Sequence, residues 1–181
     1  TPGTLIEDEL LPSRAHNYLV ALGHAESKTA IAWADMSTGD FLVQEIADDG
    51  LETMVARLDP AELIYPHDYD LPDWVIDSQI CATEQAASMF DSTRARQALE
   101  RFYQLASLDG LGDFSRSMLS AAGALLGYIE TTQVGNMPRL LPLTAVNHAN
   151  YMEIDPATRR SLELSRTLTG ERRGSLLHAV D

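Results

Sequence analysis

The chain has 181 residues, 45% of them hydrophobic, which is enough for a buried core and too many for a disordered chain. Its formal net charge of −14 is carried by residues 1–142, which hold 22 acidic and eight basic side chains. A DNA-binding face needs clustered lysine and arginine, so this part should not bind duplex DNA by itself. No apolar run approaches the ~20 residues of a membrane span.

The first half of the chain predicts several strands and one helix. Residues 16–25 alternate as a strand does, and residues 28–46 form the clearest hairpin, with Ser37, Thr38 and Gly39 at its tip. Residues 48–60 are an amphipathic helix with an apolar face, formed by Leu51, Met54, Val55 and Leu58. Residues 61–66 and 74–83 are predicted to be two further strands.

The second half predicts two long helices, and its periodicity and charge balance change near residue 140. The first helix covers 84–107, and the second covers 113–133 with Asp113 as its N-cap. Residues 134–143 contain two prolines and lack periodicity, and the residues that follow are neutral in charge, so we expect a domain boundary here. Asp155 and Pro156 then predict the start of a helix over 157–168.

The order of these elements predicts an α/β protein. Three consecutive antiparallel strands, a helical crossover, further strands and covering helices are typical of the ribonuclease H-like arrangement. The last helical start, at Ser175, is not followed by enough residues to finish a helix. We therefore expect the chain to be part of a longer protein.

Four stretches of the chain resemble the MutS family of DNA mismatch-recognition ATPases. They are "TPGTLIEDELL", "ADMSTGDF", "PAELIYP" and, most specifically, "NYMEIDPATRRSLELSRTLTGERRGSLLHAVD". The resemblance implies that residues 1–140 are a ribonuclease H-like connector domain and that residues 141–181 begin the helical core, or lever, domain. Arg159 and Arg160 would then lie in the first core helix, where solvation or an ion pair is their ordinary role.

The resemblance also implies which functions the chain has and lacks. It would be a non-catalytic connector that links the mismatch-reading domain to the core and ATPase domains and docks a MutL-type matchmaker. ATP, Mg²⁺ and mismatched DNA would be bound by other domains of a homodimeric protein. The chain has no Phe-x-Glu motif, and its only lysine, Lys28, follows Ser27, so it has no Walker A motif.

Two other functions remain open from the residues. The first is a stand-alone, Mg²⁺-dependent ribonuclease H-like nuclease, for which Asp35 and Asp40 beside the hairpin tip would be the first candidate ligands. Such a site needs acids from several elements, yet the first strand has none, and Glu52 and Asp68 are the nearest others. The second is an interaction module unrelated to repair.

No zinc site and no internal disulfide are expected. The five histidines lack paired ligand spacing, and Cys81 is the only cysteine. A single cysteine fits a reducing compartment, so we expect a cytoplasmic protein.

The predicted partner-binding surface is the exposed face of the helix over 84–107. Its apolar side would be committed to the core, leaving a polar side for a partner, formed by Arg96, Gln97, Ala98 and Glu100. The hairpin tip at 37–39 is the next candidate.

Overall fold

The computed structural model describes residues 17–47, 49–76, 78, 80–133, 137–146, 158, 161 and 162. The chain divides into two compact units, residues 1–48 with 60–147 and residues 49–59 with 148–181. The strands are β1 (Tyr18–Ala25), β2 (Lys28–Asp35), β3 (Phe41–Ile46), β4 (Glu62–Pro66), β5 (Cys81–Gln85) and β6 (Thr144–Ala145). The helices are α1 (Leu51–Leu58), α2 (Asp73–Ile76), α3 (Ser92–Tyr103) and α4 (Arg116–Thr132), with short 3₁₀ turns η2 (Ala87–Phe90) and η3 (Leu108–Gly110).

The first unit is built on one mixed sheet with the strand order β5-β4-β1-β2-β3-β6. β1, β2 and β3 form an antiparallel meander, whereas β4 pairs in parallel with β1, and β5 in parallel with β4. The short β6 adds in parallel to β3. The predicted α/β, ribonuclease H-like arrangement is confirmed, with helices flanking the sheet.

The predicted hairpin between β2 and β3 is confirmed, and hydrogen bonds to Asp35 stabilise its turn. The Asp35 carboxylate accepts hydrogen bonds from the Ser37 amide at 2.8 Å and from the Ser37 hydroxyl at 2.5 Å. Gly39 has a φ of +82°, a conformation that L side chains rarely adopt. The Gly39 amide donates to the Asp35 carbonyl at 2.8 Å, which closes the turn.

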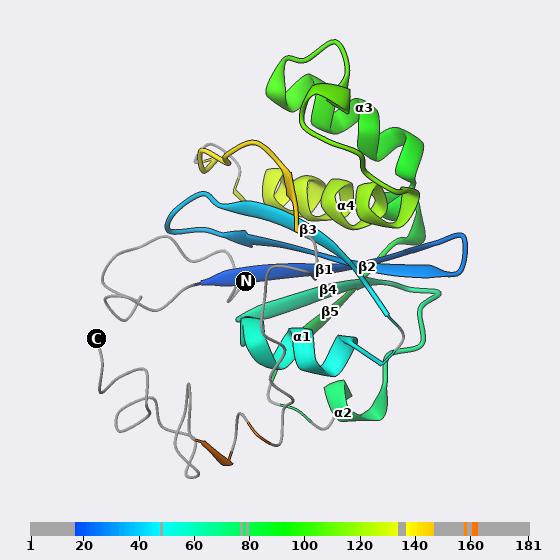
Figure 1. Ribbon diagram of the computed structural model, residues 1–181, viewed down its shortest axis with the longest axis vertical. Helices are drawn as coiled ribbons and strands as arrows, with labels where there is room; N and C mark the ends of the chain where they lie inside the picture. Colours follow the sequence, from blue (N-terminus) through cyan, green and yellow to red (C-terminus); the bar gives the residue numbers. More distant parts are fainter. Residues whose placement is uncertain are drawn as a thin grey trace. The chain divides into compact units, whose positions relative to one another are not determined.

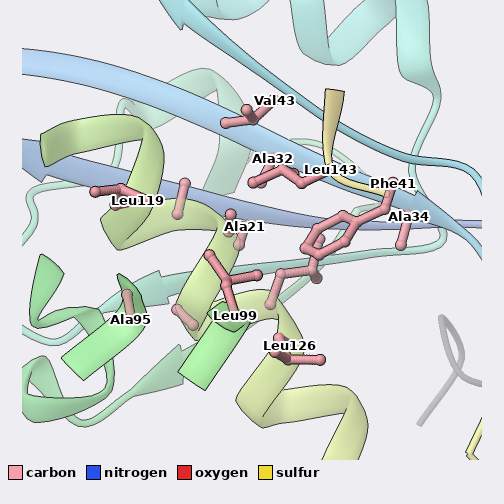
Figure 2. Close-up of a cluster of buried hydrophobic side chains, with 14 of the residues drawn as sticks. Ala21, Ala32, Ala34, Phe41, Val43, Ala95, Leu99, Leu119, Leu126 and Leu143 are labelled. Carbon is pink, nitrogen blue, oxygen red and sulfur yellow. The ribbon is translucent and has the colours of Figure 1, made fainter. Parts of the chain in front are cut away.

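α4 covers one face of the sheet, and α3 lies on the far side of α4 (Figure 1). The close approach of α4 depends on small residues in the sheet. A Cβ added at Gly23 of β1 would lie 2.7 Å from the Ser117 carbonyl oxygen and 2.8 Å from Ala121 Cα, so no side chain fits there. Figure 2 shows the resulting core, to which the three layers contribute Ala21, Ala32, Ala34, Phe41, Val43, Leu119, Leu126 and Leu99.

The second unit contains α1, which agrees with the predicted helix over 48–60. The four residues of its predicted apolar face are all buried: Leu51, Met54, Val55 and Leu58. The helix ends at Asp59, whose φ of 44° is left-handed and whose amide donates to the Val55 carbonyl at 2.9 Å. Thr158 and Ser161 are helical, as predicted for 157–168, and Leu162 is 56% exposed. Asp155, Pro156, Arg159, Arg160 and Ser175 lie outside the described residues.

The predicted strand over 74–83 is wrong in its first half. Asp73–Ile76 is a single helical turn, α2, in which the Val75 amide donates to the Pro72 carbonyl at 2.9 Å. The strand β5 begins only at Cys81. Trp74, Val75 and Ile76 form an apolar run too short to distinguish a helical turn from a strand by pattern.

The two long helices begin later than predicted. β5 and η2 occupy residues 81–90, and α3 starts after Asp91, whose carboxylate accepts from the Arg94 amide at 2.8 Å. α4 is capped by Ser115, whose hydroxyl accepts from the Met118 amide at 3.3 Å, so Asp113 is not the N-cap. The second helix is buried nearly all round, from Ser117 to Ile129 with the exception of Gly127.

The segment after α4 joins the sheet before residue 147. Leu140, Leu143 and Val146 are buried, and the Val146 amide donates to the Val43 carbonyl at 2.8 Å beside β6. The division between a connector at 1–140 and a core segment at 141–181 stays a prediction. Among the described residues, no helix is long and apolar enough to cross a membrane.

Candidate partner-binding surface

The position of α3 is fixed by hydrogen bonds at both of its ends and by packing of its inner face. Asp91 caps the first turn, and Ala95 and Leu99 are buried against α4. At the other end Gln104 takes a left-handed φ of 56°, and its amide donates to the Arg101 carbonyl at 3.2 Å. Side chains on the outer face of this helix therefore keep their relative positions, as a recognition surface requires.

The four predicted partner-binding residues are not equally exposed. Gln97 is exposed, whereas Arg96, Ala98 and Glu100 are half-buried. The Arg96 guanidinium lies 3.3 Å from the Asp109 carboxylate and 4.0 Å from that of Glu100. Arg96 therefore connects α3 to the η3 turn, and its guanidinium is already ion-paired within the protein.

Glu100 has a similar role within the protein. Its carboxylate accepts from the Leu108 amide at 3.4 Å, and Leu108 is completely buried. A hydrogen bond from Ser107, and the neighbouring Arg96, hold the pKa of Asp109 below its usual value. The helical spacing in the sequence could not show that η3 folds back to meet Arg96 and Glu100.

Two exposed arginines of α3, Arg94 and Arg101, were not among the predicted partner-binding residues. Arg94, Gln97 and Arg101 are all exposed and are spaced three and four residues apart, which places them on one face. The helical spacing itself was visible in the sequence. The two arginines place cations on the exposed side of α3, on a chain whose net charge is −14.

The C-terminal end of α3 is joined to the hairpin tip. The Tyr103 hydroxyl donates to the Leu141 carbonyl at 2.7 Å, and the Leu141 amide donates to the Gly39 carbonyl at 2.8 Å. Burial raises the pKa of Tyr103, which keeps its hydroxyl protonated as a donor. The two surfaces singled out from the sequence, α3 and the tip at 37–39, are thus held together by residue 141.

The first two candidate nuclease ligands, Asp35 and Asp40, are both hydrogen-bonded within the hairpin turn. Asp35 is completely buried and bonded to Ser37, while the exposed Asp40 accepts from the Thr38 hydroxyl at 2.8 Å. Glu52 belongs to the other unit, and Asp68 follows β4. Within the part of the chain that the structure describes, no three His, Cys, Asp or Glu side chains are placed to hold a metal ion.

A buried acid that sequence reasoning missed is Glu62, the first residue of β4. It is completely buried, and one of its carboxylate oxygens accepts from the Tyr128 hydroxyl at 2.6 Å and from the Thr83 hydroxyl at 2.9 Å. These bonds link β4, β5 and α4. Glu62 is therefore a structural hydrogen-bond acceptor that orients these three elements.

The fold agrees with the family to which the chain is similar. A family model described as MutS domain II matches residues 17–141, which include every strand but β6, together with α1 to α4. The chain belongs to the MutS family.

Its relatives in the MutS family share extensive identity with it. The DNA mismatch repair protein MutS of Ruegeria pomeroyi is 46% identical over 184 residues, and that of Dinoroseobacter shibae is 42% identical over 181. That of Cereibacter sphaeroides is 43% identical. Each comparison covers all of this chain, but the chain spans only about a fifth of the length of these MutS proteins.

Proposed function

We propose that the chain is a non-catalytic connector within a MutS-type mismatch-recognition ATPase. The observation that carries the proposal is that the MutS domain II match covers strands β1 to β5 with both α3 and α4, the layers that share one core. Such a unit can transmit movement as a rigid body between a mismatch-reading domain and a core with its ATPase. ATP, Mg²⁺ and mismatched DNA would bind to other parts of the whole protein, a cytoplasmic homodimer.

The negative charge of the chain supports the proposal that other domains of the whole protein bind the DNA. Residues 1–142 carry the whole net charge of −14, which opposes the approach of phosphates. The isolated chain should show no binding to matched or mismatched duplexes in fluorescence anisotropy at physiological salt. Micromolar affinity, or Mg²⁺-dependent cleavage of nucleic acid by the purified chain, would contradict the non-catalytic connector.

We further propose that α3 docks a MutL-type matchmaker through its outer face. The predicted set is Arg96, Gln97, Ala98 and Glu100, and the exposed row of Arg94, Gln97 and Arg101 extends it. Gln97 belongs to both groups and is exposed, and its side chain has no ion pair or hydrogen bond within the part of the chain that is described. It is therefore the cleanest residue to change, whereas a change at Arg96 also breaks the contact with Asp109.

The docking proposal is tested in a chimera, in which this chain replaces its counterpart in the Ruegeria pomeroyi relative. Gln97→Glu should weaken recruitment of the matchmaker to mismatched DNA in a pull-down by about tenfold, as for a central interface residue. Mismatch binding and ATP hydrolysis should not change. Glu130→Gln, at an exposed residue near the end of α4, is the control and should leave recruitment intact. If Gln97→Glu recruited the matchmaker as well as Glu130→Gln does, α3 would not be the docking site.

A further inference from the structure

A pocket of about 290 Å³ lies at one edge of the sheet, away from the middle of α3. β1, β4 and β5 run parallel to one another, so their carboxyl ends meet at this edge. The pocket is lined by His24 from β1, Pro66 from β4 and Ala87, which follows β5. In open α/β sheets, the crevice outside the carboxyl ends of parallel strands is the usual place for a ligand.

Aromatic rings form part of the pocket wall. The Tyr69 ring lies 6.1 Å from the His24 ring at an interplanar angle of 49°, and Phe90 contributes a third, buried ring. The faces of such rings attract cations, and the planar guanidinium of arginine also stacks on them.

Two carboxylates lie in the same lining. Asp68 and Asp91 are both exposed, and Asp91 uses one oxygen to cap α3 by accepting from the Arg94 amide. Asp68 has no hydrogen bond or ion pair with any described residue. No lysine or arginine belongs to the described lining, so the side chains present an anionic and aromatic surface to a ligand.

We propose that this pocket binds an arginine side chain of a partner protein. A guanidinium can stack on Tyr69 while it donates to Asp68 and Asp91 in a charge-assisted way. The volume lies at the lower limit of the roughly 300–1,000 Å³ of small-molecule sites, so it suits one side chain better than a whole cofactor. The net charge of −14 favours the approach of a basic partner segment.

The probe for the test is blocked arginine, N-acetyl-arginine methylamide, titrated into the ¹⁵N-labelled chain. Saturable chemical-shift changes are expected at the amides of Tyr69, Ser88 and Asp91. The isosteric but neutral blocked citrulline should leave these signals unchanged. Changes of equal size with citrulline, or no changes with arginine, would overturn the proposal.

Charge variants show whether the carboxylates provide the binding. Asp68→Asn and Asp91→Asn should each raise the dissociation constant of blocked arginine by about tenfold, since hydrogen bonds to charged groups are the strong ones. Asparagine caps a helix as well as aspartate does, so Asp91→Asn should leave α3 intact. Asp70→Asn removes an equal charge from an exposed residue outside the lining and should not change the affinity. If Asp70→Asn weakened the binding of blocked arginine equally, the effect would come from the overall negative charge of the chain. That result would overturn the proposed site.

Discussion

Gly123 of α4 lies directly against Ala95 of α3. A Cβ added at Gly123 would meet the Ala95 Cβ well inside van der Waals contact and would lie 2.7 Å from Ala95 Cα. Ala95 and Leu99, the two buried residues of α3, both belong to this contact layer (Figure 2). The position of the proposed docking helix therefore depends on a glycine in its neighbour.

Gly123→Ala should lower the free energy of unfolding by about 1–3 kcal/mol, because it overpacks the contact between two helices. Chemical denaturation measures the change. Gly127→Ala is the matched control in the same helix, since nothing lies within 4 Å of an added Cβ there. It should stabilise the chain by about 0.5–1 kcal/mol through helix propensity. Similar effects at both positions would show that the contact with Ala95 does not limit packing.

The β-hairpin and the amphipathic helix could be predicted because their signals are local. Ile31 and Trp33 alternate with small residues along one strand, and Gly39 supplies the turn conformation that the tip needs. Each of these features lies within a few residues of the chain, so the sequence order displays it directly.

The rest depends on contacts between residues far apart in the sequence. The fit of Gly23 against Ser117, and of Gly123 against Ala95, arises only when the layers are assembled. The ion pair that engages Arg96 likewise requires η3 to fold back onto α3. The sequence therefore could not show how exposed the individual residues of the predicted docking face are; the docking itself stays a prediction.

The hydrogen bond from Tyr128 to the buried Glu62 gives a second prediction. Tyr128→Phe removes a donor from a completely buried carboxylate, and should cost about 1–3 kcal/mol of unfolding free energy. Tyr65→Phe is the control, because the half-buried Tyr65 hydroxyl has no hydrogen bond within the described part of the chain. It should change stability by no more than about 0.5 kcal/mol. Comparable losses in the two variants would mean that ring packing, and not the bond to Glu62, sets the cost.

Glu45 gives a prediction about pH. Hydrogen bonds from Ser115, then from Lys28 and Ser117, hold its pKa below the ordinary value of 4.5. A depressed pKa in the folded state adds stability above the unfolded value, and this stability is lost as the pH falls through the folded value. Glu45→Gln should therefore destabilise the chain at neutral pH, and the difference from the parent chain should shrink as the pH falls below 4.5. Unfolding curves measured across this range test it, and a difference independent of pH would contradict it.

The last prediction concerns the segment that joins the hairpin tip to α3. A Cβ at Gly39 would collide with the Arg139 carbonyl oxygen, and the φ of +82° is unfavourable for alanine. Gly39→Ala should therefore break the bond from the Leu141 amide to the Gly39 carbonyl, and that amide should exchange with solvent much faster. Gly110→Ala is the control, since Gly110 has no positive φ and an added Cβ there meets nothing within 4 Å.

Tyr103→Phe tests the hydrogen bond that joins the same segment to α3. It removes the hydroxyl that donates to the Leu141 carbonyl, so exchange at the Leu141 amide should rise by about tenfold, as expected for one lost hydrogen bond. The Val146 amide is an internal reference, because it is held by Val43 in β3 and should keep its protection. If Leu141 and Val146 accelerate together, the whole segment opens as one unit. If neither changes, the tip and α3 are independent surfaces, and a partner that contacts one of them need not sense the other.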